Sequence, residues 1–150
     1  MKRIVVIGAG PGGLCAGKRL KDAGFTDFVI LERASGVGGT WRHNTYPGCR
    51  CDVPSMLYSF SFAPSVEWSE PYAGQDEIRR YMEQVAERFG LTPHIRLNTR
   101  ASGAEWNDKT QTWTVTTHDG ETFVADILIG AVGLFNEPAY PDIPGLSDFK

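Results

Sequence analysis

The chain has 150 residues, about the length of one domain, and 41% of them are hydrophobic and 22% charged. Its 18 acidic and 15 basic side chains leave a net charge of −3, which gives no reason to expect a nucleic-acid partner. No apolar run approaches the ~20 residues that a membrane span needs, so no membrane span is expected.

The first 31 residues predict a right-handed βαβ unit. Residues 2–7 form a short β-branched run typical of a buried strand, and residues 11–23 fit a helix that Gly24 ends. Residues 28–31 predict a second buried strand, parallel to the first. Residues 33–74 then lack periodicity but are rich in aromatic side chains, which favours an ordered functional loop over disorder.

Helical periodicity returns at residues 76–89, with an apolar stripe at Ile78, Tyr81, Met82, Val85 and Phe89. Short strands separated by turn sequences follow and predict a small antiparallel meander; they are residues 95–97, 101–106, 112–117 and 122–124. Residues 127–130 predict a last apolar strand, and the Pro-rich residues 138–150 predict an irregular tail.

The turn after the first strand matches G-x-G-x-x-G at Gly8, Gly10 and Gly13. In this motif the first glycine permits a tight turn, the second lets a pyrophosphate approach the backbone, and the third lets the helix pack closely on the sheet. The anion then binds the free amides at the positive end of the helix. Glu32 ends the second strand, where a carboxylate can accept hydrogen bonds from ribose hydroxyls. Together these features predict a dinucleotide site, although their spacing does not choose between FAD and a nicotinamide cofactor.

Two further segments carry a family resemblance: Gly38-Gly39-Thr40-Trp41 and Tyr46-Pro47-Gly48-Cys49-Arg50-Cys51-Asp52. With the glycine loop, they make the chain resemble the N-terminal part of Baeyer–Villiger monooxygenases, which are related to the flavin-containing monooxygenases. The resemblance extends over essentially all 150 residues. It implies a Rossmann-like α/β FAD-binding fold, with a parallel sheet and a small antiparallel meander, that spans residues 1–150 and is incomplete.

The resemblance also implies roles for individual residues. Asp52 matches a catalytic active-site acid near the flavin, Glu32 holds the ribose, and the backbone of Ala101 lies against the adenine. Val132 stands where the family has threonine, so any role of that hydroxyl is lost here. The implied cofactor-binding residues are Gly8, Gly10, Pro11, Gly12, Gly13, Glu32, Arg33, Gly39, Thr40, Trp41, Asp52, Tyr58 and Ala101.

The implied reaction uses FAD, NADPH and O₂ to insert one oxygen atom into a ketone, giving an ester or lactone. The family's F-x-G-x-x-x-H-T fingerprint would start at Phe149, and its NADPH-binding loop would follow. The sequence therefore resembles a fragment, and we expect the 150-residue chain not to complete the reaction by itself. N- or S-oxygenation, or a non-catalytic nucleotide-binding module, are the alternative functions.

Some polar residues allow more than one interpretation. Cys49 and Cys51 lack the spacing of a zinc site or a C-x-x-C pair, so free thiols in a reducing cytoplasm are expected. Arg50 is either a solvated charge or a phosphate contact, and Trp41 and Tyr58 could simply anchor the loop. The histidines have no ligand spacing, so no metal is expected, and His94 and His118 are expected at the surface.

Overall fold

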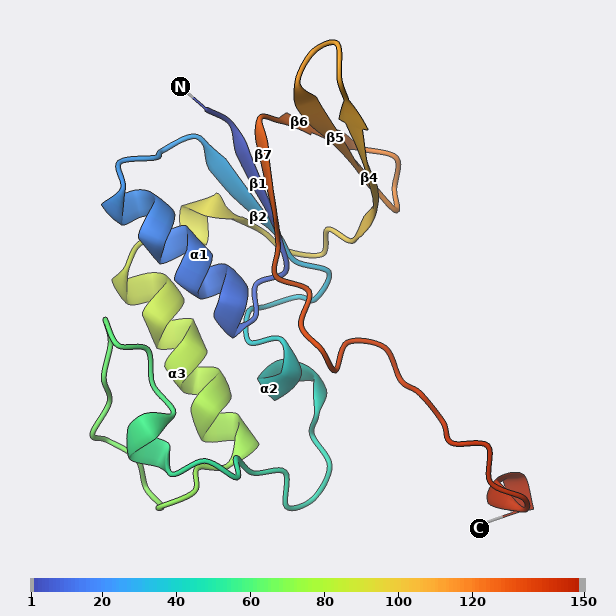
Figure 1. Cartoon of the computed structure of the whole chain (residues 1–150). Helices are drawn as coiled ribbons and strands as arrows, with labels where there is room; N and C mark the ends of the chain where they lie inside the picture. Colours follow the sequence, from blue (N-terminus) through green and yellow to red (C-terminus); the bar gives the residue numbers. More distant parts are fainter. Residues whose placement is uncertain (1, 149–150) are drawn as a thin grey trace.

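A computed structural model describes residues 2–148 (Figure 1). Its regular elements are β1 (Ile4–Ile7), α1 (Pro11–Asp22), β2 (Phe28–Leu31), α2 (Thr40–His43), α3 (Gln75–Arg88), β3 (Ile95–Arg96), β4 (Ala101–Asn107), β5 (Thr112–Thr117), β6 (Thr122–Ala125) and β7 (Ile127–Gly130). Three short 3₁₀ helices are added at Ser55–Leu57, Thr92–His94 and Leu146–Asp148. Within the described part, no helix has the length and apolarity to cross a membrane.

A four-stranded parallel sheet in the order β3-β2-β1-β7 forms the centre of the fold. Helices α1 and α3 lie on one side of it and the β4-β5-β6 sheet lies on the other (Figure 1). Alternate residues of β1 enter two separate cores: Ile4 and Val6 pack with the helices, and Val5 packs with Val115 of β5. Because both faces are covered, β1 is apolar throughout, as the sequence suggested.

The expected elements are confirmed, with one correction to the meander. The strand predicted at residues 95–97 is β3, which pairs in parallel with β2 and belongs to the central sheet. The antiparallel sheet consists of β4, β5 and β6 only. A two-residue strand carries no alternation of side chains, so its partner could not be inferred from its own sequence.

His94 also differs from expectation, because it is half-buried rather than at the surface. Its ring stacks on Phe28 with 4.0 Å between ring centroids, and its Nδ1 lies 3.1 Å from the Phe28 carbonyl oxygen. His118 is exposed, as expected. The tail is irregular apart from its 3₁₀ turn, and Phe149, where the family fingerprint would start, lies outside the described residues.

Candidate dinucleotide-binding site

A cavity of about 470 Å³ opens at the carboxyl ends of β1, β2 and β7. This edge of a parallel sheet is where α/β folds bind ligands. Its lining combines the glycine loop with four segments that are distant in sequence. The lining residues are Ile7, Gly8, Gly10, Pro11, Gly12, Leu31, Glu32, Arg33, Gly39, Thr40, His43, Thr99, Arg100, Ala101 and residues 131–137.

The N-terminus of α1 opens into this cavity without a side-chain cap. Gly10 is the N-cap residue, its backbone is extended, and Pro11 occupies the first helical turn. The first amides of a helix have no partner within the helix, and here no side chain caps them. These amides and the helix dipole make the end of α1 suitable for an anion such as a pyrophosphate.

Close backbone contacts explain three of the glycines. A Cβ on Gly13 would lie 1.8 Å from the carbonyl oxygen of Gly8, so α1 starts tightly against the turn. Gly8 has a φ of +101°, and its Cβ would lie 2.5 Å from the carbonyl oxygen of Ala131, just after β7. Gly39 has a φ of +54°, and its Cβ would lie 2.9 Å from the Cα of Gly10. The two glycine segments recognised in the sequence therefore touch each other at the cavity.

Glu32 is almost completely buried and both of its carboxylate oxygens accept backbone hydrogen bonds. Oε2 accepts from the amide of Ala9 at 2.7 Å, and Oε1 accepts from the amide of Ala34 at 2.8 Å. Each carboxylate oxygen has a second lone-pair site that a ribose hydroxyl can use. Glu32 thus fixes the glycine loop and faces the cavity at the same time.

Arg33 connects the cavity to the segment after β7. Its guanidinium donates to the Asn136 carbonyl oxygen at 3.2 Å and to Glu137 Oε1 at 3.3 Å. This contact holds residues 134–137 beside the cavity, although Leu134 and Phe135 remain highly exposed. Sequence reasoning missed His43, Thr99, Arg100 and residues 134–137; the last follow the carboxyl end of a parallel strand, which was an available signal.

Trp41 and Tyr58 contact each other rather than the main cavity. Trp41 Nε1 donates to the Tyr58 hydroxyl oxygen at 2.9 Å, and the two rings meet edge to face. Tyr58 instead lines a smaller cavity of about 280 Å³ together with Pro11, Phe60 and Tyr81. Burial raises the pKa of the Tyr58 hydroxyl above its usual value of 10.0. The pair lies next to Thr40, and the flavin contact expected of Trp41 and Tyr58 stays a prediction.

Asp52 and Arg50 are also outside the lining of the main cavity. Asp52 is exposed, and its negative charge contributes to the raised pKa of Tyr58. Arg50 pairs with Glu70 and donates to the Tyr72 carbonyl oxygen at 3.1 Å. The sequence allows Arg50 to be either a solvated charge or a phosphate contact; in the structure it forms an exposed ion pair outside the main cavity. The three cysteines are free thiols, and Cys49 and Cys51 are buried.

The sequence of the chain is similar to those of known proteins. Residues 5–150 match the family model described as pyridine nucleotide-disulphide oxidoreductase. A Baeyer-Villiger monooxygenase of Streptomyces coelicolor is 52% identical over 147 residues, which cover 98% of this chain and 28% of that protein.

Solved structures show the same relationship. Cyclohexanone monooxygenase from Rhodococcus sp. Phi1 bound to NADP⁺ superposes with a TM-score of 0.88 at 38% identity, over 99% of this chain and 29% of that one. OTEMO in complex with FAD and NADP gives a TM-score of 0.89 at 36% identity, with the same coverage. The chain thus corresponds to somewhat more than a quarter of the length of these proteins.

Proposed function

Because the chain belongs to the pyridine nucleotide-disulphide oxidoreductase family, we propose that its main cavity binds FAD and that it forms the FAD-binding part of a monooxygenase. One observation carries the proposal: the uncapped N-terminus of α1 opens into the cavity of about 470 Å³ beside the buried carboxylate of Glu32. Helix amides suit a pyrophosphate, and the carboxylate suits ribose hydroxyls.

The cavity lining suggests which residues would hold each half of FAD. Glu32, Arg33 and Ala101 would line the adenosine half, and Gly39 and Thr40 the flavin half, with the glycine loop between them. Trp41, Tyr58 and Asp52 would support the flavin half from outside the main cavity, where Trp41 adjoins Thr40 and bonds to Tyr58. Asp52 remains our candidate for the catalytic carboxylate.

For the complete enzyme we propose NADPH-dependent insertion of one oxygen atom of O₂ into a ketone. The names of the relatives support this reaction over N- or S-oxygenation, and OTEMO is a complex with FAD and NADP. FAD, when bound, supplies the redox chemistry, while this chain's residues bind and orient it. The free cysteines support a reducing location, and we propose the cytoplasm.

The test of FAD binding is a visible spectrum of the chain after incubation with FAD and desalting. The parent chain should retain flavin absorbance. Gly10→Ala should lose about tenfold or more in FAD affinity, because the added methyl group enters the approach of the pyrophosphate. The methyl carbon would lie 3.4 Å from the Cα of Gly39, which is ordinary van der Waals contact, so the variant should still fold.

Gly103→Ala in β4 is the matched control, since a Cβ there would meet nothing within 4 Å. It should retain FAD like the parent. A colourless parent chain contradicts the proposed function, and a Gly10→Ala variant as yellow as the parent contradicts the assignment of the pyrophosphate to this loop.

A further inference from the structure

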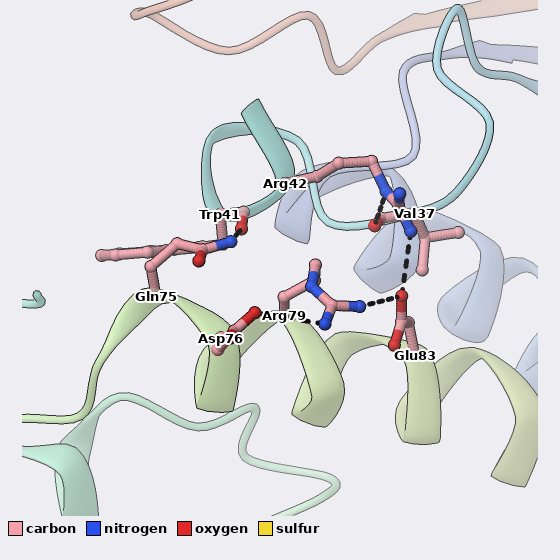
Figure 2. Close-up of polar contacts among 7 residues, drawn as sticks. All are labelled: Val37, Trp41, Arg42, Gln75, Asp76, Arg79 and Glu83. Carbon is pink, nitrogen blue, oxygen red and sulfur yellow. Dashed lines mark hydrogen bonds and ion pairs between the residues drawn. The ribbon is translucent and has the colours of Figure 1, made fainter. Parts of the chain in front are cut away.

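Helix α3 makes a polar contact with the segment that carries one wall of the main cavity. Its apolar stripe packs in the core, whereas Gln75, Arg79 and Glu83 face residues 36–43 (Figure 2). This segment includes Gly39 and Thr40, which line the cavity. The proposed FAD site does not use the polar face of α3, so its role has to be explained separately.

Glu83 is the centre of this contact (Figure 2). Its Oε1 accepts from a terminal nitrogen of Arg42 at 2.9 Å and from one of Arg79 at 2.7 Å. The other terminal nitrogen of Arg79 donates to Asp76 at 3.2 Å. These side chains are partly exposed, so each ion pair contributes little to the free energy of unfolding. What the contacts do determine is the position of the Arg42 guanidinium.

Arg42 in turn holds the backbone of its own segment. Its Nε donates to the carbonyl oxygen of Val37 at 2.9 Å. The guanidinium lies so close to Gly36 that a Cβ there would come within 2.0 Å of a terminal nitrogen. Gln75 donates to the carbonyl oxygen of Trp41. Helix α3 therefore fixes the segment on both sides of Gly39 and Thr40.

Residues 36–43 are held between α3 and the glycine loop by contacts on both sides. The amide of Gly38 donates to the carbonyl oxygen of Ala9 at 3.0 Å, and Gly39 lies against Gly10 with no room for a Cβ. A shift of residues 38–40 would change the distance between the cavity wall and the N-terminus of α1. We propose that Glu83 is a positioning residue that, through Arg42, holds the Gly39–Thr40 wall against the glycine loop. The effect on FAD rests on the proposed function, whereas the effect on the segment does not.

The first test is hydrogen–deuterium exchange of the chain without added FAD. Glu83→Ala removes the carboxylate that accepts from Arg42. Gly36→Ala displaces the Arg42 guanidinium without changing any charge. Both variants should increase exchange at the amides of residues 38–44 severalfold and leave β4–β6 unchanged. The controls are Glu87→Ala, at an exposed position one turn further along α3, and Gly103→Ala. Unchanged exchange at residues 38–44 in both test variants overturns the proposal.

The second test compares the affinities of the chain for FAD and for ADP, which lacks the flavin half. Glu83→Ala should raise the Kd for FAD severalfold and change that for ADP by less than about twofold. A general loss of structure would weaken both, so equal losses, or no loss for FAD, overturn the proposal. If the parent chain binds no FAD, the proposed function fails, and the exchange experiment still decides the role of Glu83.

Discussion

At the residue scale, Glu32 combines a structural and a binding role in one carboxylate. Its oxygens satisfy the amides of Ala9 and Ala34, and it faces the cavity where a ribose would bind. The sequence predicted only the second role, because the glycine loop and the end of β2 come together only in three dimensions. A buried carboxylate that accepts two backbone hydrogen bonds cannot be replaced by its amide without a mismatch.

Glu32→Gln should therefore lower the free energy of unfolding by about 1–3 kcal/mol. The amide nitrogen of glutamine is a donor and would face one of the two backbone donors. Urea denaturation measures the change, with Glu67→Gln as the control because Glu67 is exposed. An unfolding midpoint equal to that of the control would show that the bonds of Glu32 add nothing to stability.

Some of the predicted site residues lie at the cavity and others do not. Pro11, Glu32 and Ala101, which the sequence predicted to bind the cofactor, line the cavity, because each lies at or next to the end of a regular element whose direction was predictable. Trp41 lies in the short α2, Tyr58 and Asp52 lie in the loop after it, and all three are outside the cavity lining. Their positions depend on contacts such as the Trp41–Tyr58 hydrogen bond, which no local pattern encodes.

At the element scale, Lys21 links α1 to the end of α3 by hydrogen bonds. Lys21, in the last turn of α1, donates to the carbonyl oxygens of Phe89 and Gly90 at 2.9 and 2.8 Å. These carbonyls follow the end of α3, where a cation also compensates the helix dipole. The helices themselves were predicted to within a residue or two, but this connection between them requires their packing to be known.

Lys21→Met keeps the apolar stem and removes the charge, so it should lower the free energy of unfolding by about 1 kcal/mol. The urea midpoint should fall accordingly, whereas Lys109→Met in the exposed β4–β5 turn should leave it unchanged. Equal midpoints for the two variants would mean that water replaces the Lys21 contacts at no cost.

At the scale of the whole molecule, the cavity depends on segments from both halves of the chain. Strand β7 pairs with β1, and its continuation through residues 131–137 lines the cavity together with Gly39 and Thr40. The sequence predicted β7 with its observed bounds, yet strand order follows from long-range pairing rather than from any local signal. Residues 134–137 were missed as part of the site, although they follow the carboxyl end of β7 and the glycine loop was recognised.

This arrangement predicts that FAD protects part of the tail from chymotrypsin. Phe135 lines the cavity and is 82% exposed, so the following bond should be cut readily in the chain without added FAD. Leu146 is also exposed but lies outside the cavity lining, which makes its bond an internal control. Saturating FAD should slow cleavage after Phe135 and leave cleavage after Leu146 unchanged, as followed by mass spectrometry. Equal slowing at both bonds would indicate general stabilisation, and no slowing at either would mean that residues 134–137 do not contact the cofactor.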